Sequence, residues 1–284
     1  MNIRIVAKKI KSVSSVKKIT NAMQLVSAVK MKKAQQIAIE GKPYQTIIQQ
    51  AIKKLLSTSE IQESPYVKTN ESASEKELTI LITSNKGLCG SFNVNLLRFL
   101  MKEMTIKQND FITLGKKGAV LINIMGGTIL ADYSDSQPTE AVDAVFDQAS
   151  ALFLEGKYKK IHVVYNSFVS SLRYDPTRET ILPLIIDTTT EPVQNSNEDY
   201  LLEPKNEDLI KALLKDYILE KIRFSVLESE ACEHSARMIA MKNATDNATD
   251  VIYNLTLLRN KLRQQKITYE LLDMITAKES VETN

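Results

Sequence analysis

The first part of the chain carries apolar side chains at helical spacing. Residues 1–40 contain neither glycine nor proline. The apolar positions recur at intervals of three and four, with a slight shift round the helix, at Ile3, Val6, Ile10, Val13, Val16, Ile19, Met23 and Val26. This spacing places them along one side of an α-helix. Gly41 and Pro43 predict a break, and the apolar pattern over 47–56 predicts a further helix after it.

The last eighty residues form a second and much longer helical pattern. Lys205 to Asn284 contains no glycine and no proline, so a single helix over this stretch would reach on the order of 100 Å. A heptad-like stripe runs through Met241, Ala244, Ala248, Val251, Leu255, Leu258, Leu262, Gln265, Tyr269 and Leu272. Sustained heptads predict a left-handed coiled coil, and the N-terminal helix is the natural partner. Because that helix is shorter, we expect the segment past Leu258 to extend beyond it and to need cover from another protein.

Between the two helices, short apolar runs alternate with helical patterns. Strands are expected at 78–83, 111–114, 128–133, 160–165 and 180–186, and helices at 93–104, 117–125 and 139–154. This alternation is typical of βα units around a mostly parallel sheet. The sequence therefore predicts an α/β fold in three parts, which are N-terminal helices over 1–57, a central α/β domain over 77–190 and a long C-terminal helix over 205–284.

Charge is nearly balanced over the whole chain but not at its beginning. The net charge is +3, whereas residues 1–39 carry nine lysines and arginines and no acidic residue. Such a basic helix fits either a nucleic-acid or lipid surface or the acidic loops of a partner protein. No aromatic residue precedes Tyr44, so the side chains that stack on bases are missing. A protein partner is therefore the favoured interpretation, and nucleic acid is not expected.

Metal, disulfide and membrane signals are weak. Cys89 and Cys232 are far apart in the sequence, and with only two histidines, His162 and His234, no metal-ligand spacing can be assembled. No apolar run approaches the roughly 20 residues that a membrane-spanning helix needs. The sequence predicts no metal site, no cofactor and no transmembrane segment.

A glycine-containing turn after the first predicted strand is the sharpest local motif. It reads TSNKGLCGSFN over residues 83–93 and precedes a predicted helix. Turns at this position bind phosphates in many nucleotide enzymes, because free backbone amides and the helix N-terminus attract anions. The motif matches neither the GxGxxG nor the P-loop fingerprint. A tight βα turn that needs glycine for its backbone is therefore favoured over nucleotide binding.

A cluster of carboxylates on the long helix is the other candidate for chemistry. Glu228, Glu230 and Glu233 could supply an acid/base pair. Arg237 and Lys242 follow at helical spacing, so ion pairs on a solvated face are the better interpretation. With no nucleophile and base arrangement elsewhere, enzymatic activity in this chain alone is not expected.

Several longer motifs resemble the gamma subunit of bacterial F-type ATP synthases. Near the N-terminus they are IKSV at 10–13, KKITNAM at 17–23 and VSAVKM at 26–31, and the 83–93 turn is similar too. The most specific run is ESEACEHSARMIAMKNATDNA at 228–248, followed by RQ at 263–264 and ITYEL at 267–271. The resemblance thus extends over the whole chain.

This resemblance implies a non-catalytic rotor shaft. The terminal helices would form an antiparallel coiled coil inside a ring of alternating alpha and beta subunits, which hold the catalytic sites. A central Rossmann-like α/β domain would stand on the c-subunit ring beside the epsilon subunit. Ion-driven rotation of that ring would then be coupled to ATP synthesis or hydrolysis. The expected location is the cytoplasmic face of the cell inner membrane, as a peripheral protein.

The resemblance also assigns contacts to individual residues. They are, for coupling or contact with the alpha and beta subunits, Met23, Lys30, Glu233, Arg237, Arg263, Gln264, Thr268 and Glu270. Tyr200 and Glu203 would face the c ring. The chain departs from the family at Arg259, where an aromatic residue is usual, and in its tail over 276–280. A nucleotide-dependent enzyme with helical arms and a basic adaptor that binds nucleic acid remain as alternatives.

Overall fold

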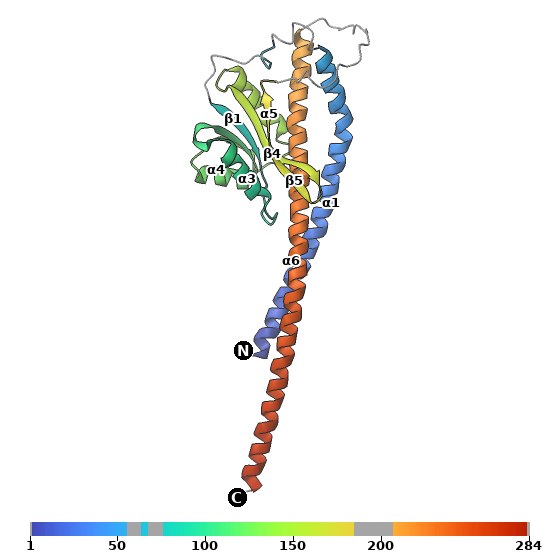
Figure 1. Ribbon diagram of the computed structural model, residues 1–284, viewed down its shortest axis with the longest axis vertical. Helices are drawn as coiled ribbons and strands as arrows, with labels where there is room; N and C mark the ends of the chain where they lie inside the picture. Colours follow the sequence, from blue (N-terminus) through green and yellow to red (C-terminus); the bar gives the residue numbers. More distant parts are fainter. Residues whose placement is uncertain (1, 56–63, 68–75, 185–206, 283–284) are drawn as a thin grey trace. The chain divides into compact units, whose positions relative to one another are not determined.

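A computed structural model describes residues 2–55, 64–67, 76–184 and 207–282 (Figure 1). The elements are, in chain order, α1 (Ile3–Leu55), β1 (Glu77–Ile82), α3 (Phe92–Glu103), the 3-10 helix η1 (Ile106–Gln108), β2 (Asp110–Leu114), α4 (Lys116–Ile124), β3 (Thr128–Asp132), α5 (Val142–Leu154), β4 (Lys160–Ser170), β5 (Arg173–Leu182) and α6 (Glu207–Glu282). They divide into two compact units. The coiled-coil unit combines the chain up to Ser27 with the chain from Arg237 onward, and the α/β unit comprises Ala28–Ala236.

The α/β unit is built on a five-stranded sheet in the order β3-β2-β1-β4-β5. The pairs β1–β2, β1–β4 and β2–β3 are parallel, while β5 runs antiparallel to β4. Apolar side chains of α3 and α4 cover one face of the sheet. The other face packs on α5 and on parts of α1 and α6, and this side holds the larger core. The predicted α/β fold with a mostly parallel sheet is confirmed.

The last two strands form a hairpin that the sequence pattern does not reveal. β4 continues to Ser170 and β5 begins at Arg173, so the prediction of a last strand beginning at Thr180 is wrong. β5 lies at the edge of the sheet, is half-buried over much of its length and contains Pro176. Edge strands tolerate proline and polar side chains, so β5 lacks the apolar run that marks a buried strand.

The predicted break near Gly41 is also wrong, because α1 passes through Pro43 without interruption. Proline removes one helical hydrogen bond and crowds the preceding turn. Packing on both sides of it opposes that cost. Ala34 is buried before the proline, and Ile48 and Ile52 are buried in the main core after it. Tertiary burial therefore outweighs the local signal.

The coiled-coil unit pairs the start of α1 with the later part of α6, and the two segments run antiparallel (Figure 1). The least exposed positions on α1 follow a heptad frame through Ile3, Val6, Ile10, Val13, Lys17, Thr20, Gln24 and Ser27. Their counterparts on α6 are Met241, Thr245, Ala248, Ile252, Leu255, Arg259 and Leu262. One hydrogen bond between the helices joins the Thr20 and Thr245 hydroxyl oxygens at 2.8 Å.

Part of the predicted apolar stripe lies outside this seam. Val16, Ile19 and Val26 on α1 are at least half exposed, and Val251 on α6 is exposed as well. These residues are exposed because their spacing departs from the heptad frame. From Val13 the heptad frame leads to positions occupied by lysine, threonine, glutamine and serine, whereas the apolar residues occupy the neighbouring face. The second half of the α1 seam is therefore polar.

Candidate functional site: the surface of the coiled coil

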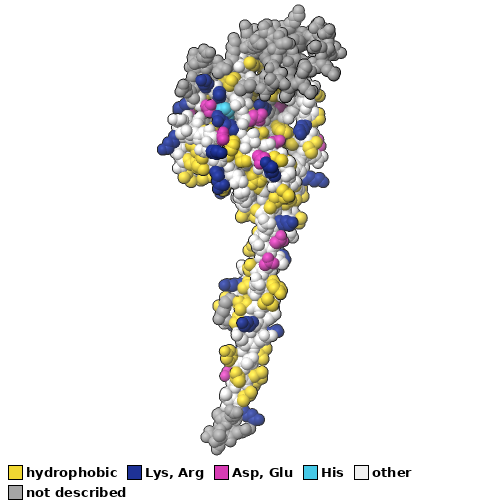
Figure 2. Space-filling model, in the orientation of Figure 1, with side chains coloured by type: hydrophobic (Ala, Val, Ile, Leu, Met, Phe, Trp, Pro, Cys, Tyr) yellow, Lys and Arg dark blue, Asp and Glu magenta, His cyan; other side chains and the backbone are white. Residues whose placement is uncertain are grey.

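The exposed side of α1 in the coiled-coil unit is both apolar and basic. Its exposed apolar side chains are Ile5, Val16, Ile19, Leu25 and Val26. Among them stand exposed cations, including Arg4, Lys8 and Lys18, and the segment has no acidic side chain. Figure 2 shows hydrophobic (yellow) and basic (dark blue) side chains, with a few acidic ones (magenta), along the rod formed by α1 and α6 in the coiled-coil unit. Apolar surface of this kind marks an interaction site, and the cations favour an acidic partner.

The end of α6 is a free helix with apolar side chains around much of its circumference. Every side chain from Arg263 to Lys278 is exposed. The large apolar ones are Ile267, Tyr269, Leu271, Leu272, Met274 and Ile275. A helix that is apolar on several sides is stable only when something surrounds it. This finding confirms the expectation that the long helix extends beyond its partner.

Four of the predicted contact residues lie in the first turns of this exposed segment. Arg263 and Gln264 are exposed, and the Thr268 hydroxyl donates a hydrogen bond to the backbone oxygen of Gln264 at 3.0 Å. Glu270 forms an ion pair with Lys266 at 3.4 Å. Both interactions stay within the helix, so these side chains remain available to a partner.

The other predicted residues are dispersed. Met23 is half-buried beside the seam in the coiled-coil unit, and Arg237, at the start of that unit's α6 segment, is buried with 7% of its surface exposed. Glu233 is half-buried and Lys30 is exposed in the α/β unit. Tyr200 and Glu203 lie outside the described residues. The structure therefore brings the free-end group together but does not join it with Met23.

The acidic cluster on α6 is not the solvated face that the sequence suggests. Glu228 is half-buried, and burial raises the pKa of its carboxyl even though the Ser167 hydroxyl and the Phe168 amide donate hydrogen bonds to it. Glu230 pairs instead with buried His234 at 3.5 Å. That hydrogen bond lowers the pKa of Glu230, and the positive charge of Lys30 acts in the same direction. The prediction of a solvated face is wrong because Ser229, Ala231, Cys232 and Ser235 on the same turns are buried.

The glycine-containing turn packs against protein. The Ser84 amide donates to Asn93 Oδ1 at 3.1 Å, and Asn93 Nδ2 donates to Ser84 Oγ at 2.7 Å. Gly90 adopts a positive φ of 57°, as a tight turn requires. Cys89 and Phe92 pack with Cys232 of α6 in a small buried cluster.

The position of this cluster bears on nucleotide binding. Parallel α/β sheets bind ligands beyond the carboxyl ends of the strands where the strand order reverses, which here lies between β1 and β4. Asn166 of β4 is fully buried there, and its backbone oxygen accepts a hydrogen bond from Cys232 Sγ at 3.3 Å. Side chains thus occupy this place, which favours the reading of the motif as a tight turn.

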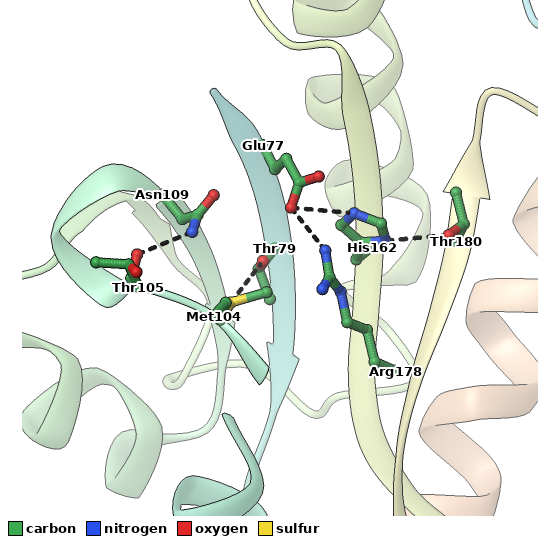
Figure 3. A network of polar contacts seen from close by, with 8 residues as sticks. All are labelled: Glu77, Thr79, Met104, Thr105, Asn109, His162, Arg178 and Thr180. Atoms are coloured by element: carbon green, nitrogen blue, oxygen red, sulfur yellow. Dashed lines mark hydrogen bonds and ion pairs between the residues drawn. The ribbon is translucent and has the colours of Figure 1, made fainter. Parts of the chain in front are cut away.

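Near the start of β1, polar side chains of neighbouring strands bond to one another rather than forming an open site (Figure 3). Glu77 Oε2 lies 2.6 Å from Arg178 Nη2 and 3.4 Å from His162 Nε2. His162 Nδ1 lies 3.2 Å from the Thr180 hydroxyl. Burial is the main reason why the pKa of His162 falls to about 4, and the Arg178 charge adds to the effect, whereas Glu77 opposes it. No group of three or more potential metal ligands occurs among the described residues.

Comparisons with known proteins agree with this geometry. A family model described as ATP synthase matches residues 2–281. A chain named ATP synthase gamma chain, from Psychrobacter sp. (strain PRwf-1), is 36% identical over 279 residues, which cover 94% of each chain. The chain belongs to the ATP synthase gamma family.

Solved structures share the fold. A chain in the OSCP/F1/c-ring structure of Euglena gracilis mitochondrial ATP synthase matches with a TM-score of 0.68 and 18% identity, covering 98% of this chain and 94% of that one. The rotor structure of the same enzyme gives 0.63 and 16%, covering 93% and 98%. The central stalk/c-ring structure from Tetrahymena thermophila gives 0.59 and 23%, covering 80% and 99%.

Family membership defines the role of this gamma chain. It is a rotor shaft subunit of an F1Fo ATP synthase and is a non-catalytic subunit of that complex. Among the described helices, none is long and apolar enough to cross a membrane.

Two features of this gamma chain were missed by sequence reasoning. The first is the exposed apolar face at Val16, Ile19 and Val26, which was read as part of the seam. The second is the hydrogen bond between Thr20 and Thr245. Both could have been found by continuing the heptad frame from Ile3 at constant period, because the frame reaches Thr20 and leaves the other three outside.

Proposed function

We propose that the coiled-coil unit turns inside a ring of alternating alpha and beta subunits, and that the exposed surface of the rod transmits force to that ring. The observation that carries this proposal is the free end of α6, where large apolar side chains stand exposed on several sides of one unpaired helix. An encircling partner covers such a helix on all sides. A partner that binds one face would leave the remaining apolar side chains in water.

We expect different parts of the rod to contact the beta subunits through different chemical groups. Around Met23 the basic surface of α1 suits an acidic lever of a beta subunit, with Lys30 adding charge next to this segment. At the free end Arg263, Gln264 and Thr268 offer polar groups to a beta-subunit loop, and Glu270 adds a carboxylate. Glu233 and Arg237 contribute to coupling from within the helix.

The remaining assignments concern the c ring, the epsilon subunit, the catalytic sites and the location of the chain. The α/β unit stands on the c-subunit ring beside the epsilon subunit, and Tyr200 and Glu203 approach that ring. The catalytic sites lie on the beta subunits, and this chain binds no cofactor and no nucleic acid. The complex places the chain at the cytoplasmic face of the cell inner membrane as a peripheral protein. The surface chemistry of the rod and the family of the chain support these assignments.

The test is reconstitution. The purified full chain is mixed with alpha and beta subunits, and the composition of the complex is measured by native mass spectrometry together with ATP hydrolysis and single-molecule rotation. We expect one gamma chain in each complex with three alpha and three beta chains, and rotation driven by ATP. Failure to assemble, or hydrolysis without rotation, would sink the proposal. Tight binding of ATP to the isolated chain would instead favour a nucleotide enzyme.

A further inference from the structure

A cavity of about 500 Å³ lies within the α/β unit between α1, α6 and the end of β4. Its apolar walls include Ile39 of α1, Phe168 of β4 and Phe224 of α6. We propose that this cavity binds a small uncharged aromatic molecule that carries one hydrogen-bonding group. The role of a rotor shaft does not require such a site.

Small residues on both helices leave room for the cavity. Ala38 of α1 and Ala231 of α6 belong to its lining, and a larger apolar side chain at either position would fill part of it. The volume falls within the range of about 300–1,000 Å³ that is typical of small-molecule sites, which combine apolar walls with a few polar groups. Because two helix faces and the end of a strand form the walls, a bound molecule would contact all three elements.

The charged residues of the lining favour an uncharged ligand. They are one lysine and one glutamate, Lys42 and Glu228. Burial raises the pKa of Glu228, the Ser167 hydroxyl and the Phe168 amide donate to its carboxyl, and its Oε2 atom is buried, so Glu228 presents no open counter-charge to a ligand. Lys42 is exposed to water. A charged group that leaves water without a partner loses its hydration, and an uncharged molecule avoids that cost.

Two phenylalanine rings in the walls favour an aromatic ligand. Phe168 and Phe224 are half-buried, and within the described part of the chain neither ring contacts another aromatic ring. Aromatic rings attract one another in offset-stacked and edge-to-face arrangements beyond the effect of buried area. An aromatic molecule can form such contacts in the cavity, whereas a saturated molecule of the same shape cannot.

Gln35 and Ser171 can bond to the polar group of the ligand. Both residues belong to the lining, and no hydrogen bond joins either side chain to another described residue. The Ser170 hydroxyl, in contrast, already accepts from the amides of Leu172 and Arg173. Amide and hydroxyl side chains both donate and accept hydrogen bonds. A hydroxyl or carbonyl group on the ligand can therefore bond to Gln35 or Ser171.

The experiment uses three probes that share one aromatic body. They are 2-naphthalenemethanol, 2-naphthylmethylammonium and 2-naphthoate, titrated into the full chain at pH 7 and followed by naphthalene fluorescence. We expect the alcohol to bind about tenfold more tightly than either ion, because the lining offers no open counter-charge. An ion that binds as tightly as the alcohol, or an alcohol that does not bind, would overturn the proposal.

A saturated probe tests the aromatic walls. Decahydro-2-naphthalenemethanol has a similar shape and the same hydroxyl, and its affinity is measured by displacement of the fluorescent alcohol. It should bind about three- to tenfold more weakly than the aromatic alcohol, because it lacks the ring contacts with Phe168 and Phe224. Equal affinities would contradict the assignment of an aromatic ligand.

Two kinds of variant locate the binding. Ala38→Leu fills part of the cavity and should weaken binding of the alcohol at least tenfold. Ala28→Leu is the matched control, because Ala28 is also half-buried on α1 but does not line the cavity, and its affinity should stay unchanged. Circular dichroism melting confirms that each variant is folded. Undiminished binding in Ala38→Leu would place the probe elsewhere on the apolar surface and reject the cavity.

The second variant removes the polar groups of the lining. The double variant Gln35→Leu, Ser171→Ala should weaken binding of the alcohol about threefold or more, because the hydrogen bond is lost. Binding of 2-methylnaphthalene, which has no hydroxyl, should not weaken. An alcohol affinity equal to that of the native chain would contradict the hydrogen-bonding role of these side chains.

A final arm distinguishes a free ligand from a side chain of another subunit. The titration with 2-naphthalenemethanol is repeated with the gamma chain assembled with alpha and beta subunits and then in the complete ATP synthase. Binding of the alcohol should persist in both. Loss of binding on assembly would show that a partner covers the cavity, and it would overturn the assignment to a free small molecule.

Discussion

The two units use their apolar residues in different ways. In the α/β unit both faces of the sheet are covered by helices, and its largest apolar side chains, among them Phe92, Phe111 and Phe146, are almost fully buried. In the coiled-coil unit Val6 is fully buried, whereas Ile19 and Leu25 are about 60% exposed. The α/β unit thus has a large apolar core, although some of its apolar side chains, such as Ile124 and Leu172, are exposed. The coiled-coil unit is shorter and leaves a larger share of its apolar side chains exposed.

The difference explains why folding and function can be separated in this molecule. Substitution of a buried apolar residue in the α/β unit removes packing that holds the fold. Substitution of an exposed apolar residue on the rod removes little of the chain's own stability, because surface changes usually contribute within about 0.5 kcal/mol. The predictions below test this division.

The largest expected effect is on the core of the α/β unit. Phe146→Ala should lower the free energy of unfolding by about 3–5 kcal/mol, since Phe146 is 1% exposed and belongs to the main core. Urea denaturation followed by circular dichroism measures the change. Ile124→Ala on α4 is the control, because Ile124 is 74% exposed and its change should stay within about 0.5 kcal/mol. Similar losses in both variants would contradict the division between buried and exposed apolar residues.

His162 gives the α/β unit a specific dependence on pH. Its pKa is about 4 in the folded chain, against an ordinary value of 6.5. Between these values the unfolded chain binds the additional proton, so stability is retained above pH 6.5 and falls as the pH drops towards 4. The contribution of one such group is at most about 1.4 kcal/mol per pH unit.

His162→Gln should remove this contribution. The measurement is the difference in unfolding free energy between the two proteins from pH 7 to pH 4.5. The native chain should lose stability faster than the variant below pH 6.5. Parallel curves over that range would mean that His162 titrates normally in the folded protein.

The exposed face of α1 should matter for assembly. Ile19→Asp places a negative charge on the basic, apolar surface and should weaken association with alpha and beta subunits by about tenfold or more. The stability of the free chain should change by no more than about 0.5 kcal/mol, because Ile19 is exposed. Val13→Asp is the contrasting variant, since Val13 is half-buried in the seam and its change should destabilise the free chain. The reverse order of effects would reject the assignment of the two faces.

The smallest effect concerns the polar layer of the coiled coil. Thr20 and Thr245 also donate to the backbone oxygens of Lys17 and Met241 in their own helices, so the hydroxyl–hydroxyl bond competes with those bonds. A double-mutant cycle with Thr20→Val and Thr245→Val should give a coupling energy of about 0.5–1 kcal/mol. Thr20→Val combined with Thr249→Val is the control and should show no coupling, since the Thr249 hydroxyl bonds only within its helix.

The sequence predicts the fold well where a pattern depends on local residues. The long helices, the parallel strands and the extension of α6 beyond α1 all follow from periodicity and from the placement of glycine and proline. The hairpin at β5 and the continuity of α1 through Pro43 could not be predicted in this way. An edge strand needs no apolar run, and the helix continues because Ile48 and Ile52 are buried by residues distant in the sequence.

In the candidate site, too, features set by local sequence were predicted and features set by distant residues were not. The exposed end of α6 was predicted from the greater length of that helix, whereas its contact residues near Thr268 were named only through the family resemblance. The burial of Glu228 and Arg237 was not predicted, since helical spacing alone places them near other charges. Their surroundings come from β4 and from neighbouring turns of α6 that the one-dimensional pattern does not order in space. All the contact assignments, for Met23, Lys30, Glu233, Arg237 and the residues at the free end, remain predictions of the family resemblance.

The measurement that tests the central claim most directly is made at the free end of α6. Leu271 and Ile275 lie one turn apart there and are about half exposed. The double variant Leu271→Asp, Ile275→Asp is compared with the native chain in two assays, which are urea unfolding of the free chain and ATP-driven rotation after assembly with alpha and beta subunits. We predict unfolding free energies within about 0.5 kcal/mol of each other and a loss of coupled rotation in the variant. A destabilised free chain that rotates normally would contradict the account.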